Sequence, residues 1–95
     1  MAIRHYPAII EGDARTGYSV FFPDLPGCTS GGTTLQEAAL NAERALAGHV
    51  DLMLQAGEEL PEPSVLDKLP RPIEPDVVEA ARLLVRVGAR ETLPA

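Results

Sequence analysis

A long amphipathic segment between residues 34 and 57 constrains the fold of this chain more than any other feature. Thr34 and Glu37 have the spacing of a capping box, in which each side chain accepts a hydrogen bond from a free backbone N–H. Gly57 suits the left-handed position that commonly ends a helix. The residues of one helical face recur at steps of three and four: Leu35, Ala38, Ala39, Ala42, Ala45, Leu46, His49, Val50 and Met53. The pattern predicts a helix of about six turns.

A second apolar line lies on the same predicted helix, displaced by roughly a quarter to a third of a turn. It consists of Leu40, Ala47 and Leu54. Two interpretations are open for this line. It either broadens the face that packs on the core or forms a contact between copies of the chain, so its three members are candidate oligomer contacts.

Extended segments precede the helix. Residues 3–11 are rich in isoleucine and predict a strand. Turn residues at 12–17 lead to a second strand at 18–22, and the two are expected to form a hairpin. The prolines and glycine of residues 23–27 end that strand, and residues 28–30 could form a short third one.

Proline dominates the segment after the helix. Residues 58–75 hold five of the nine prolines and predict an extended loop over the domain. Pro75 suits the start of a short helix through Ala81, and the alternation in residues 83–87 predicts a last strand. A strand that returns after a helix normally pairs parallel in the same sheet. The order β-β-β-α-β therefore predicts an α+β domain of three antiparallel strands, a parallel final strand and one helix on one face.

Length and charge narrow the class of protein. Ninety-five residues predict a single domain. A net charge of −6 argues against non-specific nucleic-acid binding and favours a basic partner or simply solubility. One cysteine excludes an intramolecular disulfide and points to the cytoplasm. No segment reaches the roughly 18 consecutive apolar residues of a membrane span, so no membrane association is expected.

The chemistry-bearing side chains do not form a credible active site. His5 and His49 lie far apart in the sequence, and Cys28 is better explained as a small apolar core residue than as a nucleophile. The carboxylates of Asp13, Asp24, Glu37 and Glu43 show no convergent pattern for binding metal ions. We therefore expect no catalytic residue, metal or cofactor, and a protein that is not an enzyme. Arg82, Arg86 and Arg90 form a short basic stripe that a solvated strand face explains.

A motif of aromatic, proline, glycine and cysteine residues runs from the second strand into the helix. Its members are Tyr18, Pro23, Asp24, Pro26, Gly27, Cys28, Gly32, Thr34, Glu37 and Ala38. Together with YPAIIE at residues 6–11 and LPEPS at residues 60–64, it resembles the N-terminal domain of the HicB-like antitoxin family. The resemblance spans about residues 6–64.

This resemblance implies a degenerate, partial RNase H-like fold and a role in a toxin–antitoxin system. Family members neutralise small basic HicA-type toxins that cleave RNA, so an acidic domain would mask a basic RNA-binding surface. Many members continue into a DNA-binding domain. Here we expect residues 1–95 to form a single HicB-like domain without one, and direct DNA binding is doubtful.

Candidate residues follow from this interpretation. The expected toxin contacts are Glu11, Asp13, Asp24, Leu25, Pro26 and Glu43, together with the open sheet face. The motif residues expected mainly to shape the fold are Tyr18, Pro23, Gly27, Cys28, Gly32, Thr34 and Glu37. Two other hypotheses remain open: an orphan domain that forms a homodimer or higher homo-oligomer without a toxin, and a residual nuclease.

Overall fold

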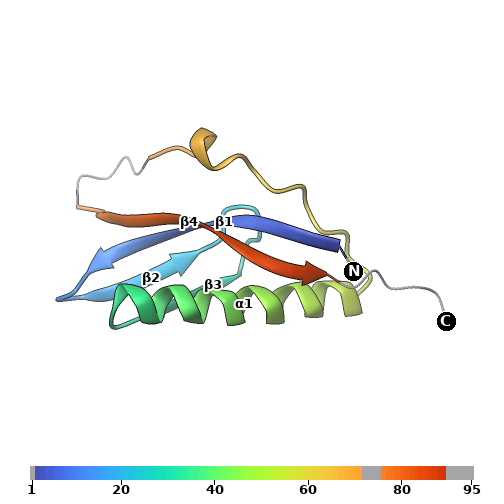
Figure 1. Ribbon diagram of the computed structural model, residues 1–95, viewed down its shortest axis with the longest axis horizontal. Coiled ribbons are helices and arrows are strands. Elements are labelled where there is room, and N and C mark those ends of the chain that lie inside the picture. Colours follow the sequence, from blue (N-terminus) through green and yellow to red (C-terminus); the bar gives the residue numbers. More distant parts are fainter. Residues whose placement is uncertain (1, 72–75, 90–95) are drawn as a thin grey trace.

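Four antiparallel strands form one sheet, and one long helix packs across one of its faces (Figure 1). The computed structural model describes residues 2–71 and 76–89. The elements are β1 (Ala2–Asp13), β2 (Gly17–Phe21), β3 (Thr29–Gly32), α1 (Leu35–Gln55), the 3-10 helix η1 (Leu66–Lys68) and β4 (Glu79–Ala89). The predicted hairpin, third strand, helix and last strand are all present, with boundaries shifted by a few residues.

The direction of the last strand was predicted wrongly. The strand order is β3-β2-β1-β4, and β4 pairs antiparallel with β1, from Ala2 opposite Ala89 to Glu11 opposite Glu79. The reason is the path of the chain between α1 and β4. That segment runs back along the whole length of the sheet after the helix ends, so β4 enters at the end where α1 began (Figure 1). The parallel rule applies when the helix alone makes the crossover.

The prediction of a short helix starting at Pro75 is also wrong for residues 76–81, which the structure describes. Pro75 itself lies outside the described residues, residues 76–78 are irregular, and β4 has already begun at Glu79. The backbone of this segment takes part in the pairing with β1 instead of forming a helix. Gly12 donates its N–H to the carbonyl of Val78 at 2.8 Å, and this bond continues the pairing of β1 with β4.

The N-terminus of α1 is capped by side chains, as the spacing predicts, with one difference. The hydroxyl of Thr34 accepts a hydrogen bond from the backbone N–H of Glu37 at 3.0 Å. The Glu37 carboxylate accepts from the N–H of Thr33, also at 3.0 Å, rather than from that of Thr34. Both side chains therefore accept from free backbone N–H groups at the helix start. The donor to Glu37 is one residue earlier in the chain than in a standard capping box.

Gly57 ends the helix as predicted. Its φ of +76° lies in the left-handed region, which glycine adopts without steric cost. The N–H of Gly57 bonds the carbonyl of Leu54 at 3.1 Å, and the N–H of Glu58 bonds that of Met53 at 2.9 Å. This pair of bonds is a Schellman motif, and it turns the chain sharply away from the helix axis.

The core lies between α1 and the sheet. The buried residues of this cluster are Tyr6, Ala8, Ile10, Val20, Phe22, Leu25, Cys28, Ala38, Ala42, Leu46, Val50, Val85 and Val87. They come from alternate positions of β1, β2 and β4, from one stripe of α1, and from the segment between β2 and β3. His49 is half-buried at the edge of this stripe, as predicted.

The second face of the sheet is not fully open. Residues 60–71, which we call the strap, start beside the helix-side core, where Leu60 packs, and then run over the second face on the way to β4 (Figure 1). The carbonyl of Pro61 accepts hydrogen bonds from the Tyr6 hydroxyl at 2.7 Å and from Arg4 at 3.1 Å. Further along, the carbonyls of the strap accept from Arg82. Ile9, which is not part of the helix-side core, is nevertheless buried. The predicted loop over the domain is thus confirmed.

Candidate functional site

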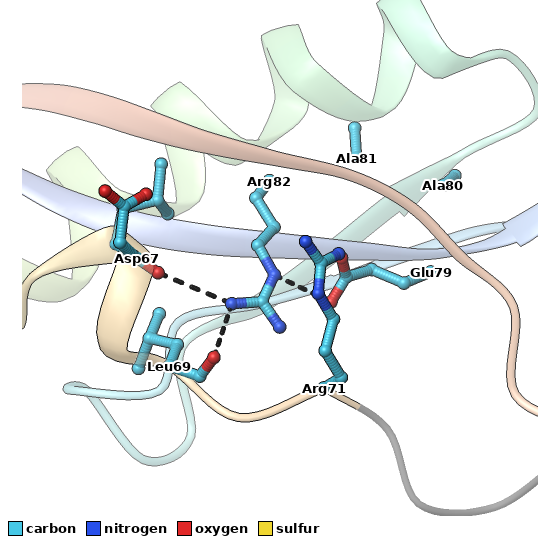
Figure 2. Close-up of a pocket in the computed structure, with 8 residues that line it drawn as sticks. Asp67, Leu69, Arg71, Glu79, Ala80, Ala81 and Arg82 are labelled. Atoms are coloured by element: carbon cyan, nitrogen blue, oxygen red, sulfur yellow. Dashed lines mark hydrogen bonds and ion pairs between the residues drawn. The ribbon is translucent and has the colours of Figure 1, made fainter.

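A cavity of about 520 Å³ between the strap and β4 is lined by three charged side chains that bond one another, Arg71, Glu79 and Arg82. Figure 2 shows Arg82 reaching from β4 toward Leu69 of the strap, with Glu79 and Arg71 close to it. Arg82 bonds the Glu79 carboxylate through Nε at 2.8 Å and the carbonyl of Leu69 through Nη1 at 2.7 Å. Arg71 bonds the other Glu79 oxygen at 2.7 Å.

These contacts are structural. The Arg82 side chain is 11% exposed, and each of its three nitrogens donates within the protein, to Glu79 or to strap carbonyls, including that of Pro70. The guanidinium therefore fastens the strap to β4, with four of its five N–H groups bonded inside the domain. This corrects the expectation of a solvated stripe for Arg82. Arg86 is exposed as expected, and Arg90 lies outside the described residues.

The motif residue Asp24 is the second fastening point of the strap. One carboxylate oxygen accepts the backbone N–H of Ser64 at 2.7 Å, and the other accepts the Ser64 hydroxyl. Asp24 was predicted as a toxin contact, and both of its oxygens are engaged inside the domain. The PDLPGC and LPEPS segments therefore form one contact in three dimensions.

The predicted contact residues do not form one surface. Asp13 holds the β1–β2 turn by accepting the backbone N–H groups of Arg15 and Thr16, each at 2.9 Å, and the Thr16 hydroxyl. The Thr16 backbone bond, its hydroxyl and the Arg15 N–H together lower the pKa of the Asp13 carboxyl. Glu11 lines a shallow cavity of about 400 Å³ beside the same turn. Glu43 is exposed on α1.

The loop after β2 contains one buried and one exposed member of the predicted set. Leu25 is only 1% exposed and most of its side chain packs in the core, so it is chiefly a core residue. Pro26 is exposed. Cys28 is buried, and burial raises the pKa of its thiol, which agrees with the packing role predicted for it. Gly27 has a φ of +88°, the left-handed conformation that the turn requires.

The glycines that follow Cys28 allow β3 to approach its neighbours. A Cβ atom on Gly32 would lie 2.6 Å from the backbone nitrogen of Ala38 at the start of α1. The Asn41 side chain donates to the carbonyl of Gly31 at 2.8 Å and ties the same helix to β3. Gly32 thus has the structural role expected of it. Tyr18 and Pro23 are half-buried beside the core.

The second apolar line on α1 contains both a core residue and exposed residues. Leu54 packs against the core, so it is not a free oligomer contact. Leu40 is 52% exposed and Ala47 is exposed, which leaves a smaller apolar surface than predicted.

A groove that was not predicted from the sequence lies at the C-terminal end of α1. It has a volume of about 510 Å³ between the loop after β2 and the last turns of α1, and we call it the helix-end groove. Its lining residues are Asp24, Leu25, Pro26, His49, Leu52, Met53, Ala56 and Glu58. Leu52 is 66% exposed. It belongs to neither periodic line of the helix, so periodicity did not single it out.

Two further observations concern the described ranges only. Among residues 2–71 and 76–89, no group of three or more His, Cys, Asp and Glu side chains is placed to hold a metal ion. The search of these same ranges finds no helix with the length and hydropathy needed to span a bilayer.

Comparison with known proteins identifies relatives. A family model described as "HicB_like antitoxin of bacterial toxin-antitoxin system" matches residues 6–93. A 14.9 kDa protein of Haemophilus phage HP1 is 46% identical over 63 residues, which are 66% of this chain and 47% of that protein. Antitoxin HicB 2 of Photorhabdus laumondii is 41% identical over 59 residues, 62% of this chain and 42% of that one. The chain spans less than half the length of these two relatives.

Solved structures show the same architecture. The N-terminal domain of Burkholderia pseudomallei antitoxin HicB superposes with a TM-score of 0.70 at 30% identity, covering 88% of this chain and 98% of that one. The HicA3 and HicB3 toxin–antitoxin complex contains a chain that matches with a TM-score of 0.58 at 32% identity, covering 70% of this chain and 76% of that one. A Streptococcus pneumoniae toxin–antitoxin complex, at 23% identity and a TM-score of 0.73 over 99% and 78% of the two chains, shares the fold.

Proposed function

Because the chain belongs to the HicB-like antitoxin family of bacterial toxin–antitoxin systems, we propose that it neutralises a small basic HicA-type, RNA-cleaving toxin. The antitoxin would bind the toxin in the cytoplasm and mask its RNA-binding or active surface. The observation that carries the proposal is the family match over residues 6–93. The similarity to a chain of the HicA3–HicB3 complex supports a partner of this class.

Charge supports the same partner. The chain has a net charge of −6, and no Lys or Arg occurs between Arg44 and Lys68. That interval contains five acidic residues, namely Asp51, Glu58, Glu59, Glu62 and Asp67. A surface of one sign steers an oppositely charged partner and competes with RNA for the same basic site.

The proposed activity is binding rather than catalysis. Three of the carboxylates that a nuclease might use accept hydrogen bonds from backbone N–H groups of the domain itself: Asp13, Asp24 and Glu37. The thiol of Cys28 is buried. These side chains therefore stabilise the fold.

A second candidate function is an orphan homo-oligomeric domain without a toxin. The exposed Leu40 on α1 and the exposed Leu84 on β4 favour it, because each could be covered by another copy of the chain.

The experiment is a pull-down of the tagged chain from its host at low and moderate salt, followed by mass spectrometry. We expect one small basic protein in stoichiometric amount, and we expect the purified chain to block RNA cleavage by that protein. Recovery of the bait alone, with light scattering that reports a homodimer, would instead establish the orphan domain.

A further inference from the structure

We propose that the helix-end groove receives a basic amphipathic segment of the partner, with an arginine or lysine side chain lying along its apolar floor. The inference rests on the proposed function for the identity of the partner. It deepens that function by naming the surface and the chemistry of the segment that the surface selects.

The floor of the groove is apolar and accessible. Leu52 is 66% exposed, the largest exposed fraction among the exposed large hydrophobic residues of the described chain. Pro26 is exposed beside it, and Met53 is half-buried against the core below. Such a surface suits the aliphatic stem of a long cationic side chain or a leucine of the partner.

The rim of the groove is acidic. The Glu58 side chain is exposed, and no ion pair within the described residues engages it. A cation that settles on the apolar floor would therefore meet this uncompensated carboxylate.

The end of the helix adds to this field. The 21 residues of α1 direct the negative end of their dipole toward Glu58, and the last turn contains no basic residue to offset it. A positive charge on another molecule would therefore be stabilised at this helix end. Figure 1 shows that the chain turns away from the axis of α1 at this end and crosses toward the sheet as the strap.

Three other acidic side chains are already bonded within the domain. Glu79 is bonded by two arginines, Asp24 by Ser64, and Asp13 by its own turn. The cavity beside Glu11 has one exposed large apolar side chain, Val78, which is smaller than Leu52 and is 54% exposed against 66% for Leu52. The helix-end groove joins an exposed apolar floor to free negative charge.

The first test uses a defined probe, the peptide acetyl-Arg-Leu-Arg-Arg-Leu-amide, titrated into the labelled chain and followed by amide NMR. A peptide with Glu in place of Arg is the control. We expect the shifts to concentrate on residues 49–58 and on Gly27 with the basic peptide, and to disappear with the acidic one. Shifts that lie elsewhere, or no shifts, overturn the inference.

The second test uses the purified toxin identified by the pull-down. The groove variants are Leu52→Ser and Glu58→Lys, and the matched controls are Leu40→Ser, an exposed leucine on α1, and Asp67→Lys, an exposed carboxylate on η1. We expect each groove variant to weaken toxin binding by about tenfold or more, and each control to stay within about twofold, by calorimetry. Lysine near a helix C-terminus is favourable, so Glu58→Lys should keep or raise thermal stability, and weaker binding cannot then be attributed to unfolding.

The outcomes separate the two proposals. Equal toxin binding by groove and control variants overturns the groove and leaves the antitoxin function intact. If the wild-type chain binds no toxin, the proposed function fails, and the peptide titration alone decides whether the groove selects basic amphipathic segments.

Discussion

Asp24 and Ser64 are joined by two hydrogen bonds across 40 positions of sequence, and this contact fastens the strap to the loop after β2. The carboxylate accepts one bond from a backbone N–H and one from a hydroxyl, and both contacts are partly buried. Hydrogen bonds to an ionised group are stronger than neutral ones. The pair therefore joins the two most distinctive sequence motifs of the chain.

Replacing Asp24 by Ala should lower the free energy of unfolding by about 1–3 kcal/mol, because the Ser64 N–H loses its acceptor. Ser64→Ala removes only the hydroxyl bond and should cost less. A double-mutant cycle measured by urea unfolding should show that the two effects are not additive. The control is Glu43→Ala, an exposed helix position, with an expected change within about 0.5 kcal/mol. Additive effects would show that the two residues are not coupled.

Replacing Arg82 by Met should lower stability by roughly 3 kcal/mol, because several strap carbonyls lose their donor and the nearly buried Glu79 loses one of its two arginine partners. Hydrogen exchange of the amides of residues 65–70 should accelerate, since the strap is released from β4. Arg86→Met, an exposed arginine on the same strand, is the matched control and should change neither quantity. Unchanged exchange in Arg82→Met would mean that apolar packing alone holds the strap.

Two glycine substitutions should change the stability of the domain in opposite directions. Gly32→Ala places a methyl group 2.6 Å from the Ala38 backbone nitrogen, so β3 and α1 must separate, at a cost of about 1–3 kcal/mol. Gly48→Ala places a methyl group in open space within α1, and it should stabilise the protein by up to about 1 kcal/mol. Thermal melting of both variants measures the difference. A neutral Gly32→Ala would contradict the close packing of β3 on the helix.

Alkaline pH should destabilise the domain. Burial raises the pKa values of the Cys28 thiol and the Tyr6 hydroxyl above those of the unfolded chain. Their contribution is therefore complete below the unfolded-state pKa and is lost as the pH rises through the folded-state value. Urea midpoints measured from neutral to alkaline pH should fall, and Cys28→Ala should reduce the slope. The folded thiol should also react slowly with Ellman's reagent, and rapid labelling without denaturant would contradict its burial.

The helix and the hairpin could be predicted from the sequence because the signals are local. The capping residues, the three-and-four spacing and Gly57 all lie within one element, and they place α1 to within a residue or two at each end. The direction of β4 could not be predicted, because it depends on the path of the strap rather than on any pattern inside residues 79–89. The same limit explains the short helix expected at residues 75–81.

The candidate site was predicted less well, because the role of a polar side chain depends on its distant partners. The sequence pattern predicts a free Asp24 carboxylate and a solvated Arg82. In the fold, Asp24 bonds Ser64 and Arg82 bonds the strap. Leu25 looked like a loop residue and is in the core. One signal could have pointed to the helix-end groove: the absence of Lys and Arg between Arg44 and Lys68, around an exposed leucine.

The pairing of β1 with β4 has a consequence for how the domain is made. The register places Ala2 opposite Ala89, so the first strand gains its second neighbour only when residues 79–89 have been synthesised and are free to fold. Closing a loop of that length is slow compared with forming the hairpin or the helix. During synthesis, the outer edge of β1 therefore stays exposed until β4 has left the ribosome. A ribosome stalled before residue 79 would hold a nascent chain with an open, apolar sheet edge, a ready substrate for chaperones and proteases.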